Sequence, residues 1–302
     1  MATNVSLNPG ARADQTLSLN MKLLGHHELD GFGGIGEGCN MQMTKDGRRI
    51  LWLAHESAPK NFTGVDVSDP LKPKVVVQTD LPHSRVRSNS LDIVGDVMAV
   101  AYQTNAVGLK PAGMDLFDVS VPEKPRLISH FDASGEHSQG AHCLWFVDGE
   151  YIHLSCGAPD FHPRDPKDHQ IYRIVDVRNP SKPVEVGRWW YPGQREGDSE
   201  APMPRHPKFN GGYRPHNMIV YPERPDRAHG VRIKSWSARS STPASAPTTS
   251  PMRFSRRRSP TSCPVHPSYH PRAPFRSTTS SSTIAGWCSP WIASAAAFTF
   301  WR

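Results

Sequence analysis

An eight-residue motif that occurs three times constrains the fold of this 302-residue chain more than any other feature. Each copy has the form Asp-Val-x-x-Pro-x-Lys-Pro and is followed by a short run rich in Val, Leu or Ile. The copies occupy residues 66–73, 118–125 and 176–183. They begin 52 and then 58 residues apart, and a repeat of this length is typical of a propeller or a solenoid.

The motif predicts a turn between two strands. Proline has no N–H and a fixed φ, so two prolines three residues apart interrupt strand pairing. The aspartate that opens each copy follows an apolar residue at the end of a predicted strand; these residues are Asp66, Asp118 and Asp176. We expect these carboxylates to hydrogen-bond the backbone of the turn, and a role as metal ligands is the alternative.

A second repeated pattern precedes each motif. It starts with Asn or His, continues as a strand, turns at an Asp- and Gly-rich dipeptide or tripeptide, and returns as a second strand. A third strand then ends in the eight-residue motif, and no segment keeps a helical period. Four short antiparallel strands in about 50 residues predict an all-β chain, a β-propeller of four-stranded blades. Four blade starts are present, so we expect an incomplete ring that this chain does not close.

The repeated strand–Asp-Val-x-x-Pro-x-Lys-Pro–strand unit resembles the LVIVD repeat family of bacterial propeller proteins, over about residues 21–229. Members of that family are longer and usually have enough blades to close a ring. Most of their biochemical activities are unassigned, so the resemblance implies a fold more than a function.

Composition divides the chain into three parts: a polar, flexible lead-in at 1–20, the predicted blades at 21–231, and a tail at 232–302. The tail has ten Lys or Arg and no acidic residue, whereas residues 1–231 carry a net charge of −3. The overall charge of +7 is therefore no argument for specific nucleic-acid binding. We interpret the Ser-, Pro- and Arg-rich tail as the product of a frameshift near residues 228–234, or else as a disordered basic extension.

The remaining bulk properties concern location. The mean hydropathy is −0.54, no apolar run is long enough to span a membrane, and the N-terminus does not resemble a secretory signal. The five cysteines form no C-x-x-C pair, which favours reduced thiols. These features predict a cytoplasmic protein.

The candidate site consists of the residues that begin the repeated inner strands: Asn40, Asn89, His142 and His216. Because equivalent strands of successive blades line one channel, we expect these side chains to meet at its mouth and to bind an unknown small molecule or protein. The two histidines could hold a transition metal such as copper, zinc or iron, although a third ligand is then needed. The alternative is that all four satisfy backbone groups.

Other candidate sites are weaker. The glycine-rich stretch 31–38 lacks the Gly-Lys-Ser/Thr of a phosphate loop, and no nucleophile motif occurs, so no catalytic residue is predicted. Two insertions, 158–169 and about 191–214, are recognition loops or tolerated surface insertions. We therefore expect a binding or scaffolding module; the alternative function is a metal-dependent oxidoreductase or hydrolase. The sequence does not decide whether the protein is an enzyme.

Overall fold

The computed structural model describes residues 23–32, 34–146, 148–205, 208, 211–220, 228–232 and 298–301. β-Strands are the only extended regular structure of the described chain, and its only helical turns are the short 3₁₀ segments η2 (Leu29–Gly31) and η3 (Pro166–Asp168). The predicted all-β class is therefore confirmed, as a set of antiparallel sheets. Within the described residues, no helix has the length and apolarity needed to cross a membrane.

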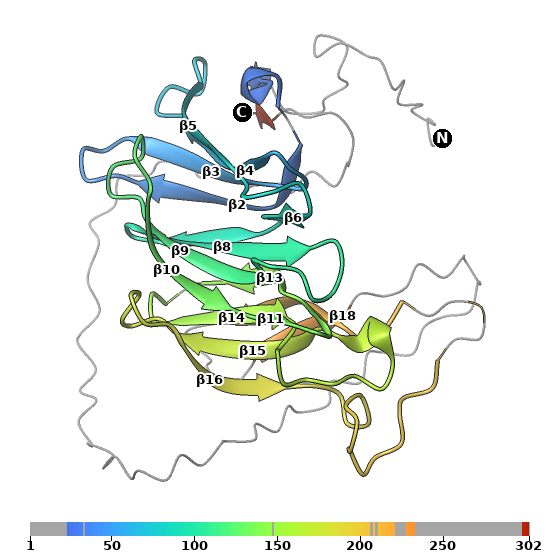
Figure 1. Cartoon of the computed structure of the whole chain (residues 1–302). Helices are drawn as coiled ribbons and strands as arrows, with labels where there is room; N and C mark the ends of the chain where they lie inside the picture. Colours follow the sequence, from blue (N-terminus) through green and yellow to red (C-terminus); the bar gives the residue numbers. More distant parts are fainter. Residues whose placement is uncertain are drawn as a thin grey trace, which may run out of the picture.

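Three antiparallel sheets follow one another along the chain (Figure 1). The first sheet has the order β2 (Ile35–Met43), β3 (Arg49–His55), β4 (Lys60–Asp66) and β5 (Lys74–Asp80). The second contains β6 (Val86–Arg87), β7 (Leu91–Val94), β8 (Val97–Thr104), β9 (Gly113–Asp118) and β10 (Arg126–Asp132), with β6 and β7 both paired to β8. The third has the order β13 (Ala141–Trp145), β14 (Tyr151–Cys156), β15 (Ile171–Asp176) and β16 (Val184–Trp189).

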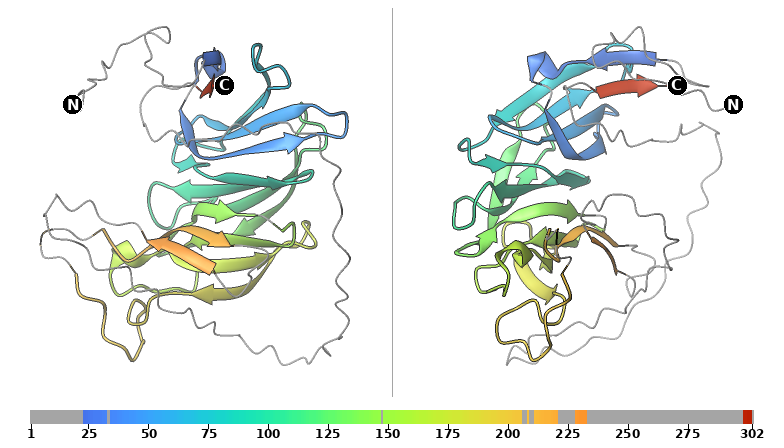
Figure 2. Two further views of the ribbon diagram at one scale, coloured as in Figure 1. Left: turned by 180° about the vertical axis from the view of Figure 1, so that it is seen from behind. Right: turned by 90° about the vertical axis from the view of Figure 1, so that its right-hand side faces the viewer.

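Three strand pairs complete the described structure: β1 (Leu23–His27) with β19 (Phe298–Trp301), β11 (Ser134–Gly135) with β12 (Ser138–Gln139), and β17 (Pro215–Val220) with β18 (Ala228–Arg232). The pair β17–β18 begins a fourth repeat beside the third sheet (Figure 2). Most of the predicted tail, residues 233–297, lies outside the described residues. The prediction that 232–302 lacks regular structure is not met at Arg232, the last residue of β18, or at 298–301, which pair with β1.

The eight-residue motifs form the turns that the sequence predicts. Each opening aspartate accepts a hydrogen bond from the N–H two residues later, at 2.9 Å for Asp66, 2.9 Å for Asp118 and 3.0 Å for Asp176. The following valines are buried, and their N–H groups bond the carbonyls of Arg49, Asp96 and Glu150, which lie at or just before the start of β3, β8 and β14. All three aspartates therefore act as turn caps, as predicted.

The sheets pack face to face, and β8 shows how. Alternate residues of a strand point to opposite faces. On one side of β8, Met98 and Val100 join an apolar cluster with Trp52 and Phe62 of the first sheet. On the other side, Ala99 and Ala101 join a cluster with residues of the third sheet. The second sheet is buried on both faces, which holds the inner strands of its neighbours in fixed positions.

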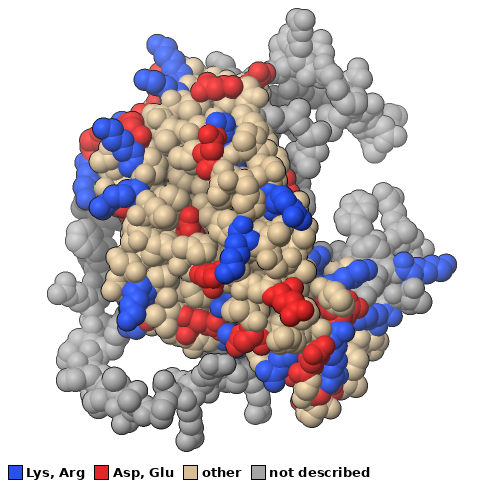
Figure 3. All heavy atoms as spheres, viewed as in Figure 1, with Lys and Arg blue, Asp and Glu red and all other residues tan. Residues whose placement is uncertain are grey.

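The two insertions pack against each other at one end of the third sheet. Arg164 in the first insertion donates to the Glu200 carbonyl in the second, and Gln194 donates to the carbonyl of Asp168. Charged side chains are dense over this region on the face shown in Figure 3, where basic and acidic groups are interspersed. The insertions therefore form a single small lobe, an arrangement that the sequence did not predict.

Candidate functional site

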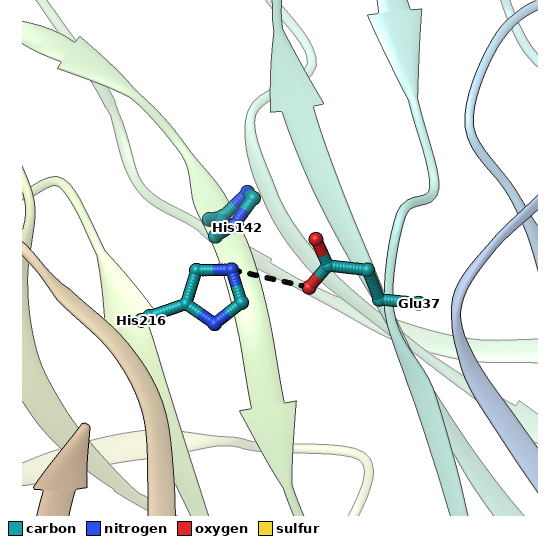
Figure 4. A group of neighbouring side chains, drawn as sticks. All are labelled: Glu37, His142 and His216. Atoms are coloured by element: carbon teal, nitrogen blue, oxygen red, sulfur yellow. Dashed lines mark ion pairs between the residues drawn. The ribbon is translucent and has the colours of Figure 1, made fainter. Parts of the chain in front are cut away.

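The innermost strands of successive repeats lie together: β2 contacts β7, β7 contacts β13, and β13 contacts β17. Near the start of three of these strands the pairing register shifts, which marks a β-bulge. The bulges contain Glu37, His142 and His216 respectively. Bulges redirect a side chain out of the regular alternation of a strand. Here they direct three side chains toward one point, although the residues are far apart in sequence (Figure 4).

The three side chains form a compact group of possible metal ligands. One donor atom from each of Glu37, His142 and His216 lies within 4.8 Å of the other two. The Nε2 atom of His216 lies 3.3 Å from Oε2 of Glu37, and the two imidazole rings meet edge to face with centroids 4.8 Å apart. Ligand atoms that bind one zinc or iron ion at about 2.1 Å lie about 3–3.5 Å from each other. Small rotations of the three side chains would therefore bring their ligand atoms into bonding distance of one ion.

Two glycines allow Glu37 to reach this position. A Cβ atom on Gly36 would lie 2.6 Å from the Asn89 carbonyl oxygen, and one on Gly38 would lie 2.1 Å from the Leu91 nitrogen. With no side chains there, β2 approaches the second sheet closely, and the N–H groups of Glu37 and Gly38 both bond the Asn89 carbonyl. Close strand approach therefore explains Gly36 and Gly38 of the glycine-rich stretch, and it places the Glu37 carboxylate beside the histidines.

The protonation of His142 can be assigned from its neighbours. Its Nδ1 lies 2.9 Å from Oε1 of Gln103, and the same oxygen accepts hydrogen bonds from Nε and Nη2 of Arg87 at 3.1 and 2.7 Å. Since a guanidinium only donates, the Gln103 atom is an acceptor, and Nδ1 of His142 must carry the proton. Nε2 of His142 then has a free lone pair. It is buried and has no hydrogen-bond partner among the described residues.

The electrostatics favour a neutral imidazole beside a carboxylate. Burial lowers the pKa of His142 to about 4; the negative charge of Glu37 opposes this shift, and the nearby cationic side chains of Arg87 and Arg214 add to it. The contact with His216 lowers the pKa of Glu37. At neutral pH, the His142 imidazole is therefore uncharged and the Glu37 carboxyl group is ionised. These are the protonation states in which the two side chains bind metal ions.

Asn89 lies next to this group in the second repeat. It occupies the interruption between β6 and β7, and its side chain is completely buried. The amide lies near enough to Glu37 to lower the carboxyl pKa, but neither amide atom has a hydrogen-bond partner of normal geometry in the described part of the structure. The structure thus brings Asn89, His142 and His216 together, as the sequence predicted, and their role in binding stays a prediction.

The fourth predicted residue, Asn40, is not at the site and must be corrected. Its amide donates to the Asp92 carboxylate, which also accepts from the Phe146 N–H at 2.8 Å, so Asn40 links the inner strands away from the histidines. The equivalent residue in the first repeat is Glu37. It lies nine residues before the turn residue Asp46, whereas His142 lies six residues before Asp148. Counting back from the turn fails because the β2–β3 hairpin is longer.

Comparison with known proteins adds little. No family model matches the chain, and no curated protein matches it. Among solved structures the chain is similar to a GH43 β-1,3-galactosidase, with 14% identity and a TM-score of 0.31 over 52% of this chain and 33% of that one. It is also similar to the N-terminal domain of Nup159, with 8% identity and a TM-score of 0.28 over 57% of this chain and 50% of that one. The chain therefore spans at most half the length of either protein, and neither activity transfers to it.

Proposed function

We propose that this protein binds one divalent transition-metal ion through Glu37, His142 and His216, and that the bound ion keeps open positions for a small ligand. The observation that carries the proposal is the buried, unprotonated Nε2 of His142, which has no hydrogen-bond partner in the described structure, on a ring that lies beside a carboxylate and a second imidazole. Leaving a buried polar atom unsatisfied costs about 1–3 kcal/mol, and a metal ion would remove that cost.

The chemistry of the donor set narrows the choice of metal. Two imidazoles with one carboxylate form a set used for zinc and for non-haem iron, and imidazole also suits copper, whereas calcium and magnesium prefer oxygen ligands. Three protein donors leave at least one coordination position open, where the ion would act as a Lewis acid or a redox centre. The amide of Asn89 would hydrogen-bond a ligand bound there.

The architecture that we propose is the one that the repeats predict: an LVIVD-like β-propeller whose ring is incomplete in this chain. Three stacked four- or five-stranded sheets with their inner strands together support it, as does the fourth pair β17–β18.

The proposed metal site favours one of the two functions that the sequence left open. Because a group of metal ligands is present, the metal-dependent oxidoreductase or hydrolase is the better-supported function. A metal-free binding or scaffolding module is the competing function.

The direct test is metal binding by the full chain. Protein stripped with a chelator is titrated by calorimetry with Zn²⁺, Cu²⁺ and, without oxygen, Fe²⁺, and retained metal is measured after dialysis. We expect one ion per chain, and we expect His142→Gln and Glu37→Gln each to weaken binding about 100-fold or more, as loss of one ligand from a three-ligand site should.

A matched control is available in a second histidine pair. His137 and His162 lie with ring centroids 5.0 Å apart, away from the inner strands. Replacing both by Gln should leave one tightly bound ion. Binding that the inner-strand variants leave intact, or that only the His137 and His162 double variant abolishes, would contradict the proposal and would favour the metal-free module.

A further inference from the structure

A cavity of about 380 Å³ lies beside the candidate metal site. Gln103 lines it and also holds Nδ1 of His142, and Arg87 lines it and donates to that same glutamine. A third lining residue, Arg214, directly precedes β17, the strand that carries His216. The cavity and the metal-ligand cluster therefore share a wall.

The lining of the cavity is polar and carries excess positive charge. It contains three arginines, Arg85, Arg87 and Arg214, and one carboxylate, that of Glu56. Glu56 pairs with Arg87, and Nε of Arg85 donates to Asn105 Oδ1 at 3.3 Å. The other lining groups are hydroxyls and amides of Ser, Thr, Asn and Gln, with apolar contributions only from Ala58 and Val86.

Of the three arginines that line the cavity, Arg214 has an N–H group without a hydrogen-bond acceptor among the described residues. Its Nε is buried and has no hydrogen-bond partner in the part of the chain that the structure describes. The carboxylate of Asp168 is near enough to act on it electrostatically, but Asp168 already accepts from Arg205 and from the N–H of Tyr213. Arg214 is only partly buried and lines the cavity, and the paired N–H groups of a guanidinium bind oxyanions strongly.

We propose that this cavity binds a small organic anion through a carboxylate or phosphate group held by Arg87 and Arg214, beside the metal-ligand cluster. The volume is within the range of small-molecule sites. Guanidinium groups bind both kinds of oxyanion with paired, coplanar hydrogen bonds. The position of the anion as a ligand or substrate of the metal site rests on the proposed function, whereas the binding of the anion itself does not.

The experiment measures anion binding by calorimetry to the full chain, both metal-free and metal-loaded. One arm compares succinate with neutral succinamide, and the other compares glycerol phosphate with glycerol, so the two oxyanion classes are distinguished. We expect at least one anion to bind and its neutral counterpart not to bind. Binding should weaken as salt is added, because the contact is partly Coulombic.

Two variants locate the site. Arg214→Gln should weaken anion binding about tenfold or more while leaving metal content unchanged. Arg126→Gln removes an exposed arginine that pairs with Asp118 at the turn, and it should change affinity by less than about twofold. If Arg214→Gln does not fold, Arg87→Lys is tested in its place. This variant keeps the positive charge but loses the paired N–H geometry, so it too should weaken anion binding about tenfold or more.

The outcomes separate the two proposals. An anion that binds the metal-free chain through Arg214 supports the cavity even if no metal binds. Metal binding without anion binding leaves the metal site standing and overturns this inference. Equal binding of charged and neutral probes, or an affinity that neither arginine variant changes, also overturns it.

Discussion

The two ends of each repeat treat their polar groups in opposite ways. At the turn end, Asp66, Asp118 and Asp176 each accept a hydrogen bond from the backbone N–H two residues later, and the valine after each aspartate bonds a backbone carbonyl of its own sheet. At the inner end, Asn89 and His142 are buried with atoms that make no hydrogen bond within the described residues. Folding alone explains the first arrangement. The second costs stability and is typical of a site that binds something.

The largest effect is expected from adding a side chain where the inner strands lie closest together. Gly38→Ala would place a Cβ about 2 Å from the Leu91 nitrogen, so β2 must move away from the second sheet. We expect a loss of about 3–4 kcal/mol in the free energy of unfolding, measured with urea, together with weaker metal binding. The matched variant is Gly47→Ala in the β2–β3 turn, where φ is +83° but the surrounding space is open. It should cost only about 1 kcal/mol and leave the site intact. Equal losses for both variants would contradict the close approach.

The two ends of a repeat should lose their contributions to stability in different pH ranges as the solution is acidified. Burial lowers the pKa of His142 from its usual 6.5 to about 4, so the unfolded chain takes up this proton first and the native state loses stability as pH falls from 6.5 to 4. Hydrogen bonds from Ser120 and Arg126 lower the pKa of Asp118 from 3.8 to about 2, so its contribution is present above pH 4 and is lost between pH 4 and 2.

Urea unfolding of the metal-free chain at a series of pH values measures both effects. His142→Gln should reduce the loss in the upper window by up to about 3 kcal/mol, and Asp118→Asn should reduce only the loss in the lower window. His153, which burial also shifts to a pKa of about 4, keeps part of the upper window in either variant. A His142→Gln profile identical to that of the parent chain would mean that this imidazole is not held neutral.

The smallest effect should come from the turn end alone. Asp118→Ala removes the acceptor for the Ser120 N–H and the partner of Arg126, both at an exposed turn. We expect a loss of about 1 kcal/mol and no change in metal affinity, because the turn is remote from the cluster. Thermal unfolding and metal titration on one preparation give both values. A variant that loses metal would show that the two ends are coupled.

The difference between the ends also explains what the sequence could predict. The turns, the strand that precedes each turn and the antiparallel pairing follow from hydrogen bonds within a few residues, and these are written locally in the Asp-Val-x-x-Pro-x-Lys-Pro motif. Asn89 and His142 could be aligned because they lie seven and six residues before the turn residues Asp96 and Asp148, and His216 because the apolar pattern after it resembles that after His142. Glu37 was missed because its hairpin is longer and its strand bulges, which changes the spacing without changing the residue pattern.

Other parts depend on contacts between distant segments, and no local pattern predicts them. The two insertions pack on each other through single side chains such as Arg164 and Gln194. The cavity beside the cluster is formed by residues from several repeats, and no sequence motif marks Arg87 or Arg214. Such residues gain meaning only when the sheets are stacked.

The placement of the ligand set has a kinetic consequence. Glu37 and His216 are 179 residues apart, and each comes from a different repeat, so the set is complete only after the intervening sheets have stacked. Contacts between such distant residues form late, because a long segment of chain must first be ordered. A bound ion would therefore slow unfolding far more than it would speed folding. The ion would link the first repeat to the fourth only after the sheets have stacked. Its release would be the first step of unfolding, in which the sheets separate.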